Sequence, residues 1–164
     1  MYLGDISENS GHMNKTSLLA RYAILIFAGL CLGACTTIKV HPINAASNPA
    51  GVVKILNNPE SGAEDLQIVI ERAFQRHGFG TQIADPATLT TSPVNPNDYI
   101  LTYSSSRKWD FAFYLGRADV YLKRGSKMVG EASYDQAGGF NVGKWGSTES
   151  KMGPILDKML AGYR

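Results

Sequence analysis

The chain has 164 residues, of which 44% are hydrophobic and 18% charged, which is the composition of one ordinary globular domain. The formal net charge of +2 is too small to favour nucleic-acid binding, which usually depends on a concentrated basic face. Both cysteines, Cys31 and Cys35, lie in an N-terminal apolar stretch. Residues 36–164 therefore contain no thiol for a disulfide, a nucleophile or a thiolate metal site.

Residues 1–34 are predicted to be a signal peptide. Lys15 and Arg21 form a positive n-region, and the uncharged run 22–34 that follows has the length of a secretory h-region. A helix that spans a bilayer needs about 20 apolar residues, so this run is short for a permanent span. The signal is complete from Met13 onward, which favours Met13 as the true start; a genuine N-terminal extension is the alternative.

The apolar run ends in Leu32-Gly33-Ala34-Cys35, which resembles the lipobox of bacterial lipoproteins. The small residues let a peptidase reach the bond before Cys35, whose sulfur accepts a diacylglyceryl group. The alternative is a core helix that happens to contain a cysteine. The lipobox implies that acylated Cys35 anchors the chain in the lipid bilayer, because two acyl signals already give stable anchoring. Thr36 follows instead of the Asp that favours inner-membrane retention, so we expect the outer membrane, facing the periplasm.

Residues 35–51 are predicted to be the lipidated cysteine and a tether, and residues 52–164 the folded periplasmic domain. The β-branched run Val52–Leu56 is typical of a strand. Ser61 and Glu64 have the spacing of a capping box, which predicts a helix over residues 62–77 with one apolar face. Gly78 ends this helix.

The remainder of the domain is predicted to be mainly strands. Apolar runs and period-two alternation predict strands at residues 79–84, 99–106, 111–123 and 127–135. Residues 124–126 turn the chain between the last two strands, and residues 86–98 and 136–146 are predicted loops. Apolar residues at helical spacing predict a last helix that starts near Ser150, since Pro154 would break a helix begun at Thr148.

The element order β-α-β-β-β-β-α predicts an α+β domain. Two amphipathic helices that cover one face of a mostly antiparallel sheet would bury the apolar residues in two layers. The first β-α-β step can add one parallel pair through a right-handed crossover.

The candidate catalytic and ligand-binding residues are few. His41 lies in the predicted tether and His77 at a helix end, without the spacing of a metal site. The run Ser104–Ser106 belongs to no known nucleophile motif and fits the polar end of a strand. Arg117 and Asp119 share a strand face, where they form either a polar groove with Tyr121 or a solvated surface. We therefore expect no catalytic residue, no cofactor and no metal ion.

The aromatic residues of the second half are more informative. Trp109, Phe111, Phe113 and Trp145 lie near predicted strand and loop ends. They belong either to the core or to a contact patch for a partner, a glycan or a membrane surface, where Trp is enriched. They are the candidate residues for partner contact.

A set of aromatic and glycine motifs carries a family resemblance. These are Trp109-Asp110-Phe111, Tyr114-Leu115, Ala118-Asp119-Val120, Gly138-Gly139 and Lys144-Trp145. The pattern is similar to a family of small uncharacterised proteobacterial lipoproteins, the Sbal-type family, over nearly all of residues 35–164. The resemblance implies no activity, cofactor or catalytic residue beyond the anchor at Cys35. At the level of fold alone, the element order also resembles other envelope lipoproteins and the N-terminal domain of the translocation protein TolB.

The sequence predicts a lipid-anchored periplasmic lipoprotein that serves as a non-catalytic binding or assembly module of the cell envelope. Its partner would be an envelope protein or a glycan, in addition to the bilayer that holds Cys35. Two alternatives remain: an envelope-acting hydrolase whose site is assembled only in the fold, and a purely structural lipoprotein without a specific ligand.

Overall fold

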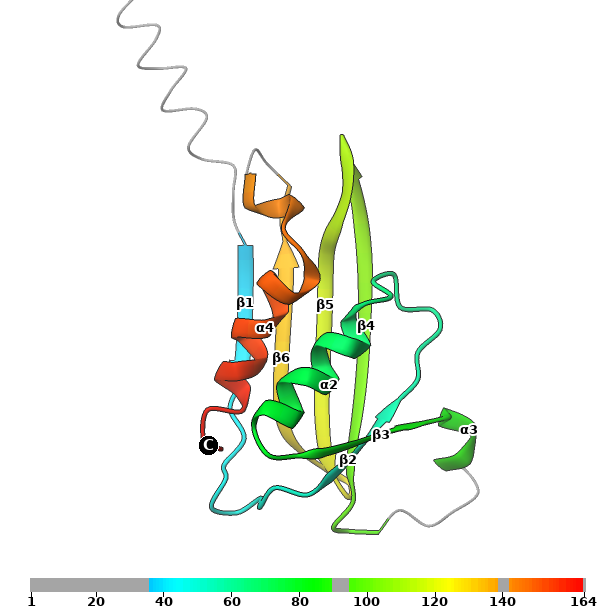
Figure 1. Cartoon of the computed structure of the whole chain (residues 1–164), viewed down its shortest axis with the longest axis vertical. Helices are drawn as coiled ribbons and strands as arrows, with labels where there is room; N and C mark the ends of the chain where they lie inside the picture. The colour runs from blue at the N-terminus through cyan, green and yellow to red at the C-terminus, as the bar shows by residue number, and fades with distance from the viewer. Residues whose placement is uncertain (1–35, 90–94, 139–141, 164) are drawn as a thin grey trace, which may run out of the picture. The chain divides into compact units, whose positions relative to one another are not determined.

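A six-stranded sheet forms one layer of the structure (Figure 1). The computed structural model describes residues 36–89, 95–138 and 142–163. The predicted signal peptide and Cys35 therefore lie outside the described residues. The six strands are β1 (Thr36–His41), β2 (Val52–Leu56), β3 (Gly80–Ala84), β4 (Tyr99–Asp110), β5 (Ala112–Arg124) and β6 (Lys127–Gln136).

The sheet is mixed, with the strand order β1-β6-β5-β4-β2-β3. The pairs β1–β6, β6–β5 and β5–β4 are antiparallel, and the pairs β4–β2 and β2–β3 are parallel. The parallel pair β2–β3 is joined through a helix, as the predicted β-α-β step requires. The predicted two-layer α+β architecture is confirmed.

Two longer helices, α2 (Leu66–Arg76) and α4 (Thr148–Met159), form the second layer on one face of the sheet (Figure 1). There are also two short helical segments: α3 (Pro86–Leu89) lies between β3 and β4 in the chain, and η1 (Val142–Trp145) lies between β6 and α4. The apolar faces predicted for both long helices are buried: Leu66, Val69, Ile70, Ala73 and Phe74 in α2, and Met152, Ile155, Leu156 and Met159 in α4. None of the helices in the described ranges is both long and apolar enough to cross a bilayer.

Strand β1 corrects the predicted tether. Thr36–His41 pairs along its whole length with β6, so the folded domain begins immediately after residue 35 and not at residue 52. The next segment is also part of the domain, because Ile43 is 3% exposed and its N–H donates to the Met159 carbonyl at 2.9 Å. Small residues make room for it: a Cβ on Gly130 would lie 2.7 Å from the Ile43 side chain.

The predicted capping box at Ser61 is wrong. Helix α2 begins at Leu66, after Asp65, and not at residue 62. Strand β4 binds the preceding segment instead: the N–H of Gly62 donates to the Ser105 carbonyl, and that of Ala63 to the Ser105 hydroxyl. The Ser61 hydroxyl also pairs with that of Ser105 at 2.6 Å. These bonds satisfy the donors that would otherwise belong to a first helical turn.

The prediction that Pro154 excludes a helix begun at Thr148 is also wrong. Ser147 caps α4, with its hydroxyl accepting the N–H of Ser150 at 3.1 Å, and Pro154 lies inside the helix. Gly153 precedes the proline and has no Cβ to collide with the ring, which lowers the steric cost of a helical conformation there. Burial of the α4 face offsets the hydrogen bond that proline cannot make.

The C-terminal tyrosine makes stability sensitive to alkaline pH. Burial raises the pKa of Tyr163 to about 12, and its hydroxyl donates to the Asn48 carbonyl. A folded-state pKa above the unfolded value of 10.0 contributes stability that is complete below pH 10 and lost as the pH rises towards 12. Tyr163→Phe keeps the ring, whose centroid lies 4.7 Å from that of Phe79, and removes the titrating hydroxyl.

We therefore expect Tyr163→Phe to unfold with a shallower loss of stability between pH 10 and 12 than the parent chain. Urea denaturation midpoints measured at several pH values between 10 and 12 test this prediction. Burial also raises the pKa values of Tyr99 and Tyr134, so part of the alkaline loss of stability is expected to remain in Tyr163→Phe. A slope identical to that of the parent chain would contradict the assignment.

Candidate functional site

The hairpin that joins β4 to β5 ends in three exposed aromatic residues. Trp109 and Phe113 are direct cross-strand partners, and Phe111 is the turn residue between Asp110 and Ala112. The exposed fractions are 68% for Trp109, 84% for Phe111 and 70% for Phe113. The sequence left core and surface positions open for these three residues, and the structure places them on the surface. We call Trp109, Phe111 and Phe113 the aromatic tip.

Phe111 holds a backbone conformation that is costly for its residue type. Its φ is +58°, in the left-handed region that favours glycine. An aromatic residue in this region costs about 1–2 kcal/mol, and its exposed side chain regains little of that by burial. A bulky apolar residue kept in a strained and exposed position points to a role outside the folded core.

A buried lysine forms an ion pair that stabilises the hairpin. The Lys144 side chain is 2% exposed, and its ammonium forms an ion pair with the Asp110 carboxylate. Trp145 is half-buried, and its Nε1 donates to the Asp110 carbonyl at 3.1 Å. The ammonium also lies 4.6 Å from the centre of the Trp145 ring. Trp145, predicted as a partner contact, therefore supports the aromatic tip from η1.

A second lysine connects this ion pair to the core. The Lys151 ammonium on α4 donates to the carbonyls of Leu115 and Lys144, the first at 3.3 Å. Burial lowers the pKa of Lys151 below its ordinary value of 10.5. The root of the hairpin, η1 and α4 thus share one hydrogen-bonded network, which ties the hairpin to the helical layer.

The strain at Phe111 gives a first test of the tip. Phe111→Gly is expected to leave the free energy of unfolding unchanged or raise it by up to about 1 kcal/mol, because glycine adopts a positive φ without steric cost. Chemical denaturation followed by tryptophan fluorescence measures it. The neighbouring Ala112, whose φ is not positive, provides the matched site: Ala112→Gly is expected to lower stability. A loss of stability in Phe111→Gly would mean that the ring packs in the native state.

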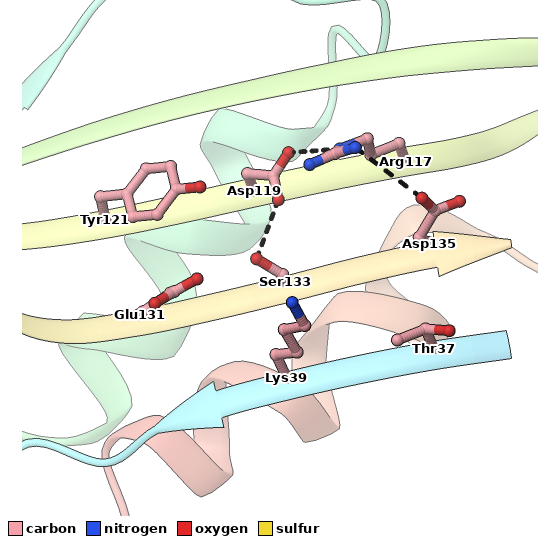
Figure 2. A pocket seen from close by; sticks show the side chains of 8 residues that line it. All are labelled: Thr37, Lys39, Arg117, Asp119, Tyr121, Glu131, Ser133 and Asp135. Carbon is pink, nitrogen blue, oxygen red and sulfur yellow. Dashed lines mark hydrogen bonds and ion pairs between the residues drawn. The ribbon is translucent and has the colours of Figure 1, made fainter.

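A polar groove of about 260 Å³ lies on the sheet face opposite the helices (Figure 2). Strands β1, β5 and β6 supply its lining residues, which are Thr37, Lys39, Arg117, Asp119, Tyr121, Glu131, Ser133 and Asp135. The polar groove predicted as one option for Arg117, Asp119 and Tyr121 is thus present. Three carboxylates and two cations give it a net charge of −1 when all are ionised.

Hydrogen bonds occupy both oxygens of the central carboxylate. Asp119 accepts from Arg117 Nε at 2.8 Å through one oxygen and from the Ser133 hydroxyl at 2.8 Å through the other (Figure 2). The hydrogen bond and charge of Asp119 raise the pKa of the Arg117 guanidinium. Arg117 also lies 3.8 Å from an Asp135 oxygen. This arrangement suits the orientation of a polar ligand better than proton transfer by Asp119.

Two other residues considered for chemistry, Ser105 and His77, have structural partners. Ser105 binds the backbone before α2, as described above. His77 follows α2, with Nδ1 2.9 Å from the Tyr163 carbonyl and Nε2 3.2 Å from an Asp157 oxygen. Across the described ranges, no three His, Cys, Asp or Glu side chains are grouped so that they could hold a metal ion. Cys35, the predicted lipidation site, lies outside the described residues.

Sequence reasoning missed the Lys144–Asp110 ion pair and the groove residues on β1 and β6. In the sequence, Lys144 is a charged residue in a glycine-rich segment, and such a residue is not expected to be buried. The alternation of residues 127–135 did place Glu131, Ser133 and Asp135 on the face opposite Gly130 and Ala132. Without β1 as a neighbour of β6, that alternation does not define a groove.

No family model and no curated protein sequence matches the chain. Among solved structures, the chain is similar to a leucine-to-methionine variant of the PelC dodecamer from Paraburkholderia phytofirmans, with a TM-score of 0.51 and 14% sequence identity. That alignment covers 79% of this chain and 100% of PelC. A second PelC dodecamer structure from the same organism has a TM-score of 0.48 and 13% identity, over 78% and 98% of the two chains.

The first of these similarities shows a shared fold and no more. The class that fold and site define is an α+β domain with one helix-covered sheet face, one open polar face and an aromatic hairpin.

Proposed function

We propose that this protein is a lipid-anchored, periplasm-facing module of the outer membrane that binds or assembles with other envelope components without catalysing a reaction. Acylated Cys35 is its anchor. The aromatic tip is its contact surface with the rest of the envelope. The proposal agrees with the Sbal-type resemblance, which implies an anchor and no catalytic residue.

The observation that carries the proposal is the exposed aromatic tip. Monomeric soluble proteins rarely expose large contiguous apolar patches, and such patches mark surfaces that contact another molecule or a membrane. The three side chains of the tip are 68–84% exposed, Phe111 keeps this position despite a costly positive φ, and the Lys144–Asp110 ion pair stabilises the base of the hairpin. Rigid aromatic residues also contribute contact area at low entropic cost.

Self-assembly is the first form of contact to test. The similarly folded PelC is a dodecamer, so a domain of this architecture can form an oligomer. Native mass spectrometry of the full chain purified from membranes measures the number of copies.

Photo-crosslinking in living cells tests the proposal directly. A photoreactive phenylalanine analogue at Phe113 is expected to form adducts, because that side chain is 70% exposed at the tip. The same analogue at Ile83, which is 42% exposed on β3 at the edge of the sheet, is the matched control. Adducts at position 113 no stronger than those at position 83 would contradict the tip as the contact surface.

The polar groove supports one second candidate, an envelope-acting hydrolase. The observation in its favour is that Asp119, Glu131 and Asp135 line a single groove. If this candidate holds, Asp119→Asn abolishes hydrolysis of envelope material by the purified protein while the fold, monitored by circular dichroism, is preserved. Equal hydrolysis by the parent chain and by Asp119→Asn, or none by either, would rule out the hydrolase candidate.

A further inference from the structure

The aromatic tip and the start of the folded domain lie at the same end of the sheet (Figure 1). Thr36 begins β1 and pairs with Gln136 on β6, and the neighbouring Asp135 pairs with Arg117 on β5. Position 116 of β5 is therefore level with Thr36. Strand β5 extends beyond that level to the turn at Phe111, and β1 runs in the opposite direction, away from the tip.

The register also gives the reach of the tip. Residues 111 and 116 are five positions apart on β5, and Gly116 is the extra residue of a bulge, so at about 3.3 Å per residue the tip projects roughly 13–17 Å beyond Thr36. Cys35 precedes Thr36 directly, and consecutive Cα atoms are about 3.8 Å apart. No linker separates the predicted acyl anchor from β1. An anchored chain therefore holds the start of β1 at the bilayer surface, with the tip directed past it.

We infer that the surface contacted by the aromatic tip is the lipid bilayer in which Cys35 is anchored. This inference rests on the proposed function, since it names the partner of the same tip. Amphipathic and aromatic elements at a membrane surface bury their apolar side chains about 5–10 Å deep. A hairpin with this reach that is tilted from the membrane normal can place the aromatic tip within that depth.

The composition of the tip fits this location. Trp109 combines a large apolar ring with an N–H donor, and such residues are enriched where bilayers meet water. Phe111 at the end of the hairpin is the most exposed of the three and has no polar group to desolvate. Arg107 and Lys108 follow on β4 towards the domain, where Arg107 lies 3.5 Å from an Asp65 oxygen and Lys108 donates to the Gln136 carbonyl at 2.9 Å, so both cations belong to the base of the hairpin and not to its tip. The acyl chains and the tip would thus fix the domain at two points.

Depth-dependent fluorescence quenching tests the inference. The full acylated protein is reconstituted into vesicles of phosphatidylethanolamine with a minor fraction of phosphatidylglycerol, carrying bromine at a shallow or a deep acyl position. We expect the parent chain to be quenched, more strongly by shallow bromines. Trp109→Phe leaves Trp145 as the only tryptophan and is expected to lose most of this quenching while retaining the fold. Equal quenching of both proteins, or none in either, overturns the inference.

A second measurement does not depend on tryptophan. In a chain whose Cys35 is replaced by alanine, partitioning onto the same vesicles is expected to fall about tenfold for Phe111→Gly, because one exposed aromatic ring is lost. Phe111→Gly is chosen because it relieves a strained backbone, so misfolding does not explain a loss. Ile83→Ser removes an exposed apolar side chain elsewhere and is expected to bind vesicles like the parent. Equal partitioning of Phe111→Gly and the parent counts against the bilayer.

These outcomes separate the inference from the proposed function. If Trp109 is not quenched but the photoreactive residue at position 113 captures an envelope protein, a glycan or a second copy, the bilayer inference is wrong and the proposed function stands. If neither quenching nor an adduct is found, both are wrong.

Discussion

Replacement of Cys35 by alanine is expected to move the protein from the membrane fraction to the soluble periplasmic fraction almost completely. In the proposed lipoprotein, acyl chains on Cys35 would supply most of the membrane affinity, since each buried methylene contributes about 0.8 kcal/mol and two chains already give stable anchoring. The variant also needs a small-residue cleavage site before position 35, because an uncleaved signal would itself hold the chain in the inner membrane. Fractionation and the mass of the N-terminal peptide measure the effect.

A weak residual association is expected in this variant, and it should fall further when Phe111 is also replaced by glycine. That second step distinguishes the contribution of the aromatic tip from that of the lipid. A parent protein whose Cys35 carries no acyl mass, together with an alanine variant that still sediments with membranes, would show that the lipoprotein interpretation is wrong. A translation start at Met13 or at residue 1 does not affect this test, because both starts include the lipobox.

Periodicity was sufficient to predict most of the two-layer fold. The apolar faces of α2 and α4 recur at helical spacing, and the β5–β6 hairpin alternates around Gly125, whose φ of +58° the turn requires. Strand β1 was missed because it is an edge strand with five of its six residues exposed, so its sequence lacks a buried face. Its conformation comes from pairing with β6, across about a hundred residues of chain. Local pattern does not contain that information.

The capping box failed for a related reason. Ser61 and Glu64 have the right spacing, but Ser105 on β4 offers the same donors a partner from across the fold, and the helix starts later. A local motif predicts a structure only when no tertiary partner competes for the same hydrogen bonds.

The candidate site shows the same limit. Trp109 and Phe113 alternate as core residues do, and only the projection of the hairpin beyond the helical layer exposes them. Asp119 and Arg117 could be placed on one face from β5 alone. The opposite wall of the groove comes from β1, the strand that the sequence pattern did not reveal.

Asp110→Ala is expected to lower the free energy of unfolding by about 3 kcal/mol, the largest loss that we expect from a residue of the hairpin. The Lys144 side chain is 2% exposed, so its ammonium would stay buried after losing its carboxylate. Asp110 itself is 40% exposed, which places the effect at the lower end for a broken buried pair. For a domain whose total stability is about 5–15 kcal/mol, this loss is readily measured by urea denaturation.

The double variant Asp110→Ala/Lys144→Met decides whether the buried charge is the cause. Methionine fills a similar volume without a charge, so the double variant is expected to recover most of the stability lost in Asp110→Ala. If the double variant is no more stable than the single one, the loss comes from the backbone at the hairpin and not from the ammonium. The Trp145 N–H bond to the Asp110 carbonyl is a main-chain contact and survives both changes. A stable double variant with weakened vesicle binding would therefore show that the ion pair positions the aromatic tip, because the three exposed rings themselves are unchanged.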